Sequence, residues 1–152
     1  QLVRLGLKDF VQFLGLLSRE DLAKAYRTVG KKQGLFVASS EDGEAHNRTI
    51  SEARASGALV VATDIPGHRF SYGEGEIFGK MAKPADPEDL AQKIKTQLFL
   101  PAEIQDVRRA LGVDFVRNNF SLSVVAQKVV THHEKLLARK GKLSSSGDIF
   151  VA

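Results

Sequence analysis

Residues 52–64 read Glu-Ala-Arg-Ala-Ser-Gly-Ala-Leu-Val-Val-Ala-Thr-Asp, and this stretch decides the fold. Its first half predicts a short helix that stops at Gly57, because glycine ends helices more readily than other residues. Its second half, residues 58–63, is continuously apolar, which is typical of a strand buried on both faces. The stretch therefore predicts a helix followed by a strand in the middle of a sheet.

The neighbouring segments also alternate between strand and helix. Apolar runs indicate strands at residues 11–15 and 35–38, and a short strand is predicted near residues 80–82. Capping signals predict one helix that starts at Ser18 and another that starts at Pro87, with Asp86 as its cap. Helical periodicity predicts two more helices, at residues 107–118 and 123–140. We interpret residues 65–68 as a turn and residues 73–75 as a flexible loop.

Alternating strands and helices predict an α/β fold, with a Rossmann-like parallel sheet and helices on both faces. Such sheets bind ligands outside the carboxyl ends of their strands. The loop at residues 39–49 follows one strand there, with Glu44 in the loop and Glu52 in the first turn of the next helix. We expect one domain at residues 1–140, with a ligand crevice at this loop, and a mobile tail at residues 141–152.

Composition excludes several classes of protein. The chain of 152 residues has 43% apolar residues, no cysteine, and no apolar run near the length of a membrane span. Nothing at its start resembles a signal peptide, so we expect a cytoplasmic protein. The basic surplus, 22 Lys and Arg against 18 Asp and Glu, is concentrated in residues 128–142. Because few aromatic residues are interleaved there, we expect no nucleic-acid binding, but either a solvated helix face or a peripheral contact with an acidic membrane surface.

The order and spacing of these motifs resemble a known family. The segments that carry the resemblance are residues 13–15, 35–39, 44–57, 60–63 and 86–88, together with Gly79. They are similar to the C-terminal, donor-binding half of retaining GT-B glycosyltransferases of family 4, the group that includes glycogen-synthase-like and sucrose-synthase-like enzymes. The resemblance covers roughly residues 3–136. It implies transfer of a hexose from a nucleoside-diphosphate sugar to a hydroxyl acceptor.

The resemblance also implies roles for the site residues. Glu44 would be the catalytic-site carboxylate that contacts the donor sugar, and Glu52 would hold the ribose, because an ionised carboxylate can accept from two hydroxyls at once. The residues between them would complete the donor site, and these are Ala45, His46, Asn47, Arg48 and Thr49. Backbone amides of this loop and of the helix start would bind the diphosphate. The donor would be a UDP-, GDP- or ADP-sugar, without a metal or other cofactor.

Two of these roles have alternatives in the sequence itself. Arg48 would either bind phosphate or be merely solvated. Thr49 and Glu52 also fit a capping box, in which Glu52 would only satisfy a backbone amide at the start of the helix.

The sequence departs from the family pattern after Glu44. Family members have a small residue, an aromatic residue and a glycine where this chain has Ala45, His46 and Asn47. We expect His46 to stack where the aromatic ring would lie, and Asn47 to keep the turn in a left-handed conformation. The departure leaves open a non-catalytic GT-B-like binding or regulatory domain. An unrelated α/β nucleotide-binding domain is a weaker alternative, because the chain has no glycine-rich phosphate loop.

The resemblance further implies partners outside residues 1–152. In the family, two strands and an N-terminal acceptor-binding domain precede the segment that corresponds to Gln1. Without those strands, a sheet in the order 3-2-1-4-5-6 would have a gap between residues 11–15 and 35–38. The acceptor would be a glycan, a sugar or a lipid.

Overall fold

The computed structural model describes residues 3–43, 45–73 and 76–145. Its centre is a parallel pair of strands, β1 (Leu35–Ala38) and β2 (Leu59–Ala62), paired along their whole length. A single parallel bridge between Thr63 and Ala82 places the segment around Ala82 on the other side of β2. The structure thus confirms the parallel α/β fold and the central position of β2, while the strand predicted at residues 80–82 is reduced to that one bridge.

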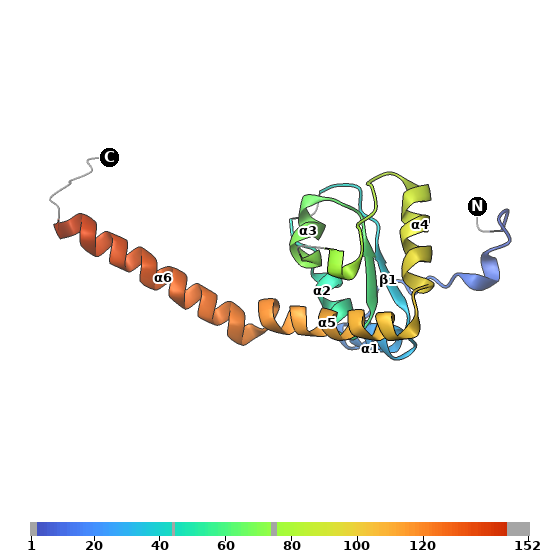
Figure 1. The fold of residues 1–152 in the computed structure, drawn as a ribbon, viewed down its shortest axis with the longest axis horizontal. Coiled ribbons are helices and arrows are strands. Elements are labelled where there is room, and N and C mark those ends of the chain that lie inside the picture. Colours follow the sequence, from blue (N-terminus) through green and yellow to red (C-terminus); the bar gives the residue numbers. More distant parts are fainter. Residues whose placement is uncertain (1–2, 44, 74–75, 146–152) are drawn as a thin grey trace.

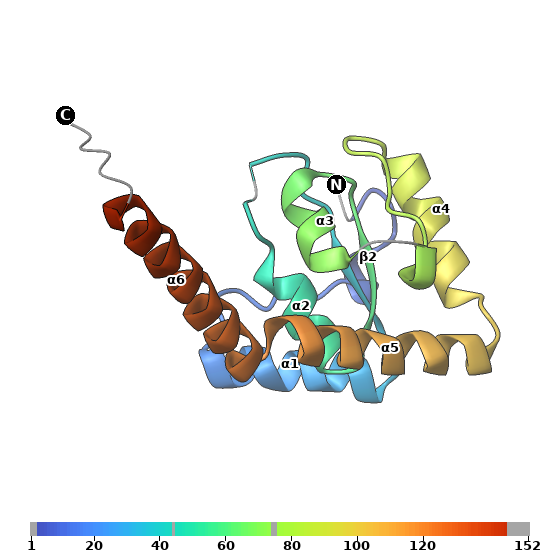
Figure 2. The same ribbon diagram turned by 60° about the vertical axis from the view of Figure 1, so that its left-hand side comes forward.

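Helices cover both faces of this sheet. In Figure 1, α4 lies on one side of the strands and α2 and α3 lie on the other, while α5 and α1 cross the end at which the strands begin. Figure 2 shows the same arrangement, with α6 projecting away from the rest of the molecule. The helices are α1 (Arg19–Lys31), α2 (Arg48–Ala55), α3 (Pro66–Tyr72), α4 (Pro87–Leu98), α5 (Ala102–Phe120) and α6 (Leu122–Ser145), with 3-10 turns η1 (Lys8–Phe10) and η2 (Glu76–Phe78).

The core lies between β2, α2 and the aromatic residues of α3, η2 and α5. Every residue of β2 is buried, and Ile50 and Ala53 of α2 are fully excluded from solvent. Burying a side chain such as Val or Ile contributes about 1.5–3 kcal/mol, so the apolar run that identified β2 also supplies much of the stability. Tyr72 and Phe78 extend this cluster toward Phe115.

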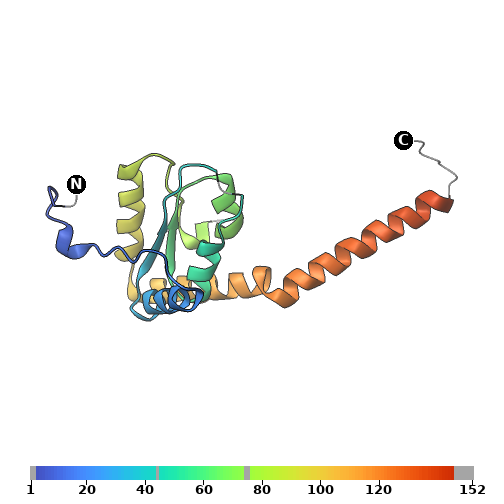
Figure 3. The same cartoon turned by 180° about the vertical axis from the view of Figure 1, so that it is seen from behind.

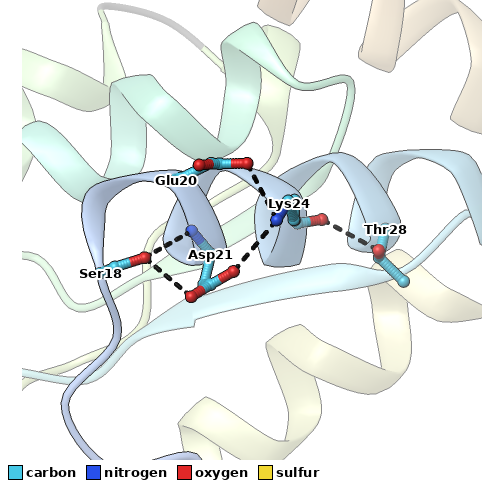
Figure 4. A network of polar contacts seen from close by, with 5 residues as sticks. All are labelled: Ser18, Glu20, Asp21, Lys24 and Thr28. Carbon is cyan, nitrogen blue, oxygen red and sulfur yellow. Dashed lines mark hydrogen bonds and ion pairs between the residues drawn. The ribbon is translucent and has the colours of Figure 1, made fainter.

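Local capping signals set two helix starts as predicted. The Ser18 hydroxyl accepts a hydrogen bond from the Asp21 backbone N–H at 3.1 Å, and its own proton goes to the Asp21 carboxylate at 2.7 Å. Lys24 pairs with both Asp21 and Glu20, which ties the first two turns of α1 together (Figure 4). Asp86 caps α4 in the same manner, with Pro87 in the first helical position.

Residues 11–15 do not form the predicted strand. They run as an irregular segment before α1 (Figure 3). Phe13 in this segment is 83% exposed. A strand needs a partner for its backbone hydrogen bonds, and none of the described residues pairs with this segment. The sequence predicted a gap in the sheet at this place, and the missing pairing is the physical reason for the irregular conformation.

Two further segments differ from the prediction. Residues 65–68, expected as a turn, are the N-cap and the first three residues of α3, which begins at Pro66. Near the other end of the chain, the helix predicted over residues 123–140 is longer, since α6 spans Leu122–Ser145. Of the mobile tail predicted for residues 141–152, residues 146–152 lie outside the described residues, as do residues 74 and 75 of the predicted loop.

Helix α6 exposes a row of apolar side chains. Leu122 is 87% exposed and Leu137 is 67% exposed, and the row also includes Val125, Val129, Val130 and Leu136. Among the described helices, none combines the length and the apolar composition that crossing a membrane requires.

Candidate functional site

The start of α2 is built around Asn47. The Asn47 side-chain oxygen accepts from the Thr49 backbone N–H at 3.0 Å and from the Thr49 hydroxyl, so Asn47 is the N-cap of the helix. Its backbone is extended, with φ of −87°, so the left-handed turn expected here is wrong. The capping box predicted from Thr49 to Glu52 is also wrong, because an N-cap at Asn47 places Glu52 beyond the first turn.

Glu52 therefore does not cap the helix. It is exposed on α2 and borders two hollows of about 290 Å³ and about 320 Å³. The smaller hollow lies between α1 and α2 and is also lined by Arg19, Tyr26 and Arg27, whereas the larger one includes Arg48. A carboxylate among three exposed arginines is suited to a ligand that combines hydroxyls with phosphate.

Tyr26 faces Glu52 from α1. Burial raises the pKa of the Tyr26 hydroxyl, and the nearby Glu52 carboxylate raises this pKa further. The phenol thus stays protonated. Tyr26 and Glu52 both line the smaller hollow.

His46 is held by aromatic rings and one hydroxyl. Its ring centre is 5.1 Å from that of Phe70 and 5.6 Å from that of Phe120, and its Nδ1 is 3.0 Å from the Ser71 hydroxyl oxygen. His46 thus meets Phe70 edge to face and Phe120 at a tilt, and its expected stacking where the family's aromatic ring would lie stays a prediction. Its ring also borders the larger of the two hollows beside Glu52.

His68 was interpreted from the sequence as a loop residue, but it lies in α3 with no exposed surface. Its Nδ1 is 2.9 Å from the Thr63 carbonyl oxygen, and its Nε2 is 3.0 Å from the Asn47 side-chain nitrogen. The dipeptide Pro66-Gly67 suggested a turn. The alternative signal was Pro66 itself, since proline is also favoured in the first position of a helix.

The structure brings most of the predicted site residues together. Ala45 to Thr49 form the entry to α2, and Glu52 follows on the same helix, where Ala45, His46 and Arg48 are exposed. Glu44 lies outside the described residues. Within the described part of the chain, no three acidic or histidine side chains are grouped in a way that could hold a metal ion.

The fold and this site can now be compared with known proteins. The model of the family described as glycosyl transferases group 1 matches residues 2–110. The chain is 35% identical over 129 residues to mannosylfructose-phosphate synthase of Agrobacterium fabrum, a match that covers 83% of this chain and 26% of that protein. It is 28% identical over 141 residues to phosphatidyl-myo-inositol mannosyltransferase of Mycobacterium tuberculosis, covering 90% of this chain and 35% of that one.

Solved structures agree with these matches. A glycosyltransferase from Rickettsia africae superposes with a TM-score of 0.74 at 28% identity, covering 90% of this chain and 34% of that chain. Anabaena HepE, solved in complex with UDP and glucose, superposes with a TM-score of 0.73 at 22% identity, and the match covers 88% of this chain and 34% of that chain. The second likeness shows the fold alone.

The chain belongs to the glycosyl transferases group 1 family. The resemblance to the C-terminal part of GT-B glycosyltransferases is thereby confirmed. The chain spans about a quarter to a third of the length of the relatives it matches.

Proposed function

We propose that this chain is the donor-binding part of a retaining glycosyltransferase that transfers a hexose from a nucleoside-diphosphate sugar to a hydroxyl acceptor. The observation that carries the proposal is the position of Glu52, which is exposed on α2 beside two hollows that three arginines also line. Membership of the family supplies the reaction class. The UDP-glucose complex of Anabaena HepE supports a nucleotide sugar as the ligand.

In this proposal Glu52 accepts hydrogen bonds from the ribose hydroxyls. Tyr26 lines the same hollow from the α1 side. The diphosphate lies at the start of α2, where the positive end of the helix dipole and Arg48 stabilise its charge. These contacts strengthen as the diphosphate leaves and gains charge, so they stabilise the transition state more than the bound donor.

Glu44 is the proposed catalytic-site carboxylate, with the donor sugar as its ligand. Ala45, His46 and Thr49 complete the donor site, with the His46 ring bordering the hollow that extends from Glu52. In transfer of this kind the protein mainly orients the donor and the acceptor, so no nucleophile triad is needed.

Calorimetric titration tests this function. The intact protein would be titrated with UDP, GDP and ADP and with their glucose and mannose conjugates. We expect one base to bind, and Glu52→Ala to weaken that binding at least about tenfold, because a hydrogen bond to a charged group contributes about 1.5–3 kcal/mol. Glu88→Ala on α4, also exposed, is the matched control and should bind like the wild type. Unchanged affinity in Glu52→Ala would refute the role of Glu52.

A non-catalytic binding domain is the second candidate. The residues that replace the family pattern, His46 and Asn47, are fixed by contacts with α3 instead of forming a glycine turn. Such a loop could retain donor binding while the chemistry is lost. Transfer of sugar by the intact protein would exclude this candidate, whereas binding without transfer to glycan, sugar or lipid acceptors would support it.

We further propose that the apolar row of α6 packs on an acceptor-binding domain. The row holds large apolar side chains that are 41–87% exposed, and Val3, Phe10 and Phe13 before α1 are also exposed. Exposed apolar surface of this extent is typical of an interface. A peripheral membrane contact is the alternative, because Lys128, Lys135 and Arg139 lie on the same helix. Binding of the intact protein to anionic vesicles, abolished by Leu137→Glu, would favour the membrane.

A further inference from the structure

We propose that His68 is a positioning residue for the donor site: it holds the loop at residues 45–47 against the carboxyl end of β2 through Asn47. The inference rests on the proposed function for its ligand, but the contacts that carry it are independent of any ligand. They run from Thr63, just after β2, through His68 in α3 to Asn47 at the start of α2.

The hydrogen-bond chemistry of the chain fixes the direction of each contact. The Asn47 side-chain oxygen already accepts from Thr49, so its nitrogen faces His68. An amide nitrogen only donates, and therefore Nε2 of His68 accepts. The carbonyl oxygen of Thr63 only accepts, and therefore Nδ1 of His68 carries the proton. Both requirements select the same neutral tautomer, with the proton on Nδ1.

Burial makes this arrangement costly to break. His68 has no exposed surface, and Asn47 is only 6% exposed. A buried polar group that loses its partner costs about 1–3 kcal/mol, because water cannot replace the bond. The Asn47 side chain is therefore held on two sides, by the α2 cap and by His68.

Further contacts tie the same loop to α3. The Asn47 backbone N–H donates to the Gly67 carbonyl at 3.3 Å, and the Ser71 hydroxyl contacts Nδ1 of His46 at 3.0 Å. Helix α3 thus serves as the support on which residues 46 and 47 lie. Because α2 begins at Arg48, a shift of Asn47 would move Arg48 and the start of the helix together.

Two variants separate the contact with Asn47 from the contact with Thr63. In His68→Gln, the longer side chain places an amide oxygen near the position of Nε2, where it can accept from Asn47. In His68→Asn, the shorter amide can replace Nδ1 and donate to Thr63, but it does not reach Asn47. Both variants bury a neutral amide of the same chemistry, so their general cost to folding is matched.

The intact protein and both variants would be titrated with the nucleotide that the wild type binds, and their thermal unfolding would be recorded. We expect His68→Gln to bind within about threefold of the wild type and His68→Asn to bind at least about tenfold more weakly, with similar melting temperatures for the two. A difference of about tenfold corresponds to the loss of one buried hydrogen bond. Equal weakening in both variants, or wild-type binding by His68→Asn, would overturn the proposal.

Asn47→Ser provides a test that leaves His68 in place. Serine is as good an N-cap as asparagine, but it has no amide to donate to His68. We expect Asn47→Ser to weaken nucleotide binding, and the double variant with His68→Asn to be no weaker than the worse single variant, because both remove the same contact. Additive losses would contradict the coupling between the two residues.

A measurement without ligand distinguishes failure of this inference from failure of the proposed function. If the wild type binds no nucleotide sugar, the proposed function fails, but hydrogen exchange at the Thr49 amide still reports on the loop. That amide donates to Asn47, so its exchange should be at least about tenfold faster in His68→Asn than in His68→Gln. Equal exchange rates would overturn the positioning role.

Discussion

The guanidinium carbon of Arg54 lies 3.8 Å from the centre of the Phe78 ring, inside the core and not at the surface. Arg54 is only 2% exposed, and the rings of Tyr72 and Phe115 also lie within cation–π range. Its Nη1 donates to the carbonyls of Ser71 and Tyr72, while its Nη2 has no partner among the described residues. Burial lowers the pKa of Arg54 to about 10, because the charged form is poorly solvated there.

This relationship predicts opposite results for two substitutions. Arg54→Met keeps an apolar stem of similar length and removes an incompletely paired buried charge, so we expect the free energy of unfolding to stay within about 1 kcal/mol of the wild type or to rise. Arg54→Ala leaves a cavity among three rings and should cost about 2–4 kcal/mol. Urea denaturation at neutral pH measures both. A large loss in Arg54→Met would show that the bonds to α3 outweigh the desolvation of the charge.

Two helical glycines provide a matched pair of predictions. A Cβ atom on Gly30 in α1 would lie 1.8 Å from the Ser56 carbonyl oxygen, so the backbones of α1 and α2 must move apart in Gly30→Ala. On Gly112 in α5, the three atoms nearest to a Cβ would belong to the Arg54 side chain, at 3.6–3.8 Å, which is ordinary van der Waals contact. We expect Gly30→Ala to lower the free energy of unfolding by about 1–3 kcal/mol. Gly112→Ala should stabilise by up to about 1 kcal/mol, because alanine favours a helix.

The thermal unfolding temperatures of these two variants should therefore move in opposite directions. A stable Gly30→Ala protein would mean that α1 is not packed on α2 as closely as the structure shows.

The sequence predicted elements whose causes are local. Ser18 and Asp86 were identified as caps because the signal lies within three residues of the helix start. The strand β2 was identified because burial on both faces requires a continuous apolar run. Residues 11–15 have an equally strand-like sequence, but a strand also needs a partner, which local sequence does not supply.

The candidate site shows the same limit. The sequence offered Thr49 as an alternative cap for the helix that carries Glu52, but the cap is Asn47. The choice of cap depends on α3, which presents His68 and Gly67 to Asn47 from about twenty residues away. The buried Arg54 was likewise beyond prediction, because a cation on a helix usually indicates an exposed face.

Acid should destabilise the protein partly through Asp89. The Lys83 backbone N–H donates to its carboxylate at 2.8 Å and Lys93 pairs with it at 3.1 Å, and these contacts hold the pKa of Asp89 below its ordinary value. A carboxyl whose pKa is lower in the folded than in the unfolded protein stabilises the fold at pH values above the unfolded-state pKa, which is about 3.9. This stabilisation is lost as the pH falls through the folded-state pKa. We expect Asp89→Asn to be less stable than the wild type at pH 6 and to differ less at pH 2.

Glu88→Gln is the control for this pH dependence. It removes the same charge from the same turn of α4, but Glu88 is exposed. Urea midpoints at pH 6 and pH 2 should change little in this variant. A pH dependence in Glu88→Gln equal to that in Asp89→Asn would assign the effect to the helix dipole instead of to the contacts with Lys83 and Lys93.

Arg109 joins α5 to the sheet by hydrogen bonds, and its substitution should be costly. From α5 it donates to the carbonyls of Gln33 at 2.7 Å, Gly57 at 3.0 Å and Gly34 at 3.2 Å, and it thereby joins the loops that lead into β1 and β2. Arg109→Met leaves these carbonyls without their donor and should cost about 2–4 kcal/mol. Arg109→Lys should recover only part of the loss, because an ammonium group cannot reproduce the fork of a guanidinium.

A variant of the neighbouring Arg108 is the control, because it removes a positive charge from α5 without removing the bonds of Arg109. The Nη1 of Arg108 donates to the Gln97 side chain at 3.0 Å, and it bonds to neither of the loops before the strands. We expect Arg108→Met to cost less than about 1 kcal/mol in urea denaturation, since it removes one partly exposed hydrogen bond. Equal losses in Arg108→Met and Arg109→Met would show that α5 is held to the sheet by its apolar contacts and not by the bonds of Arg109.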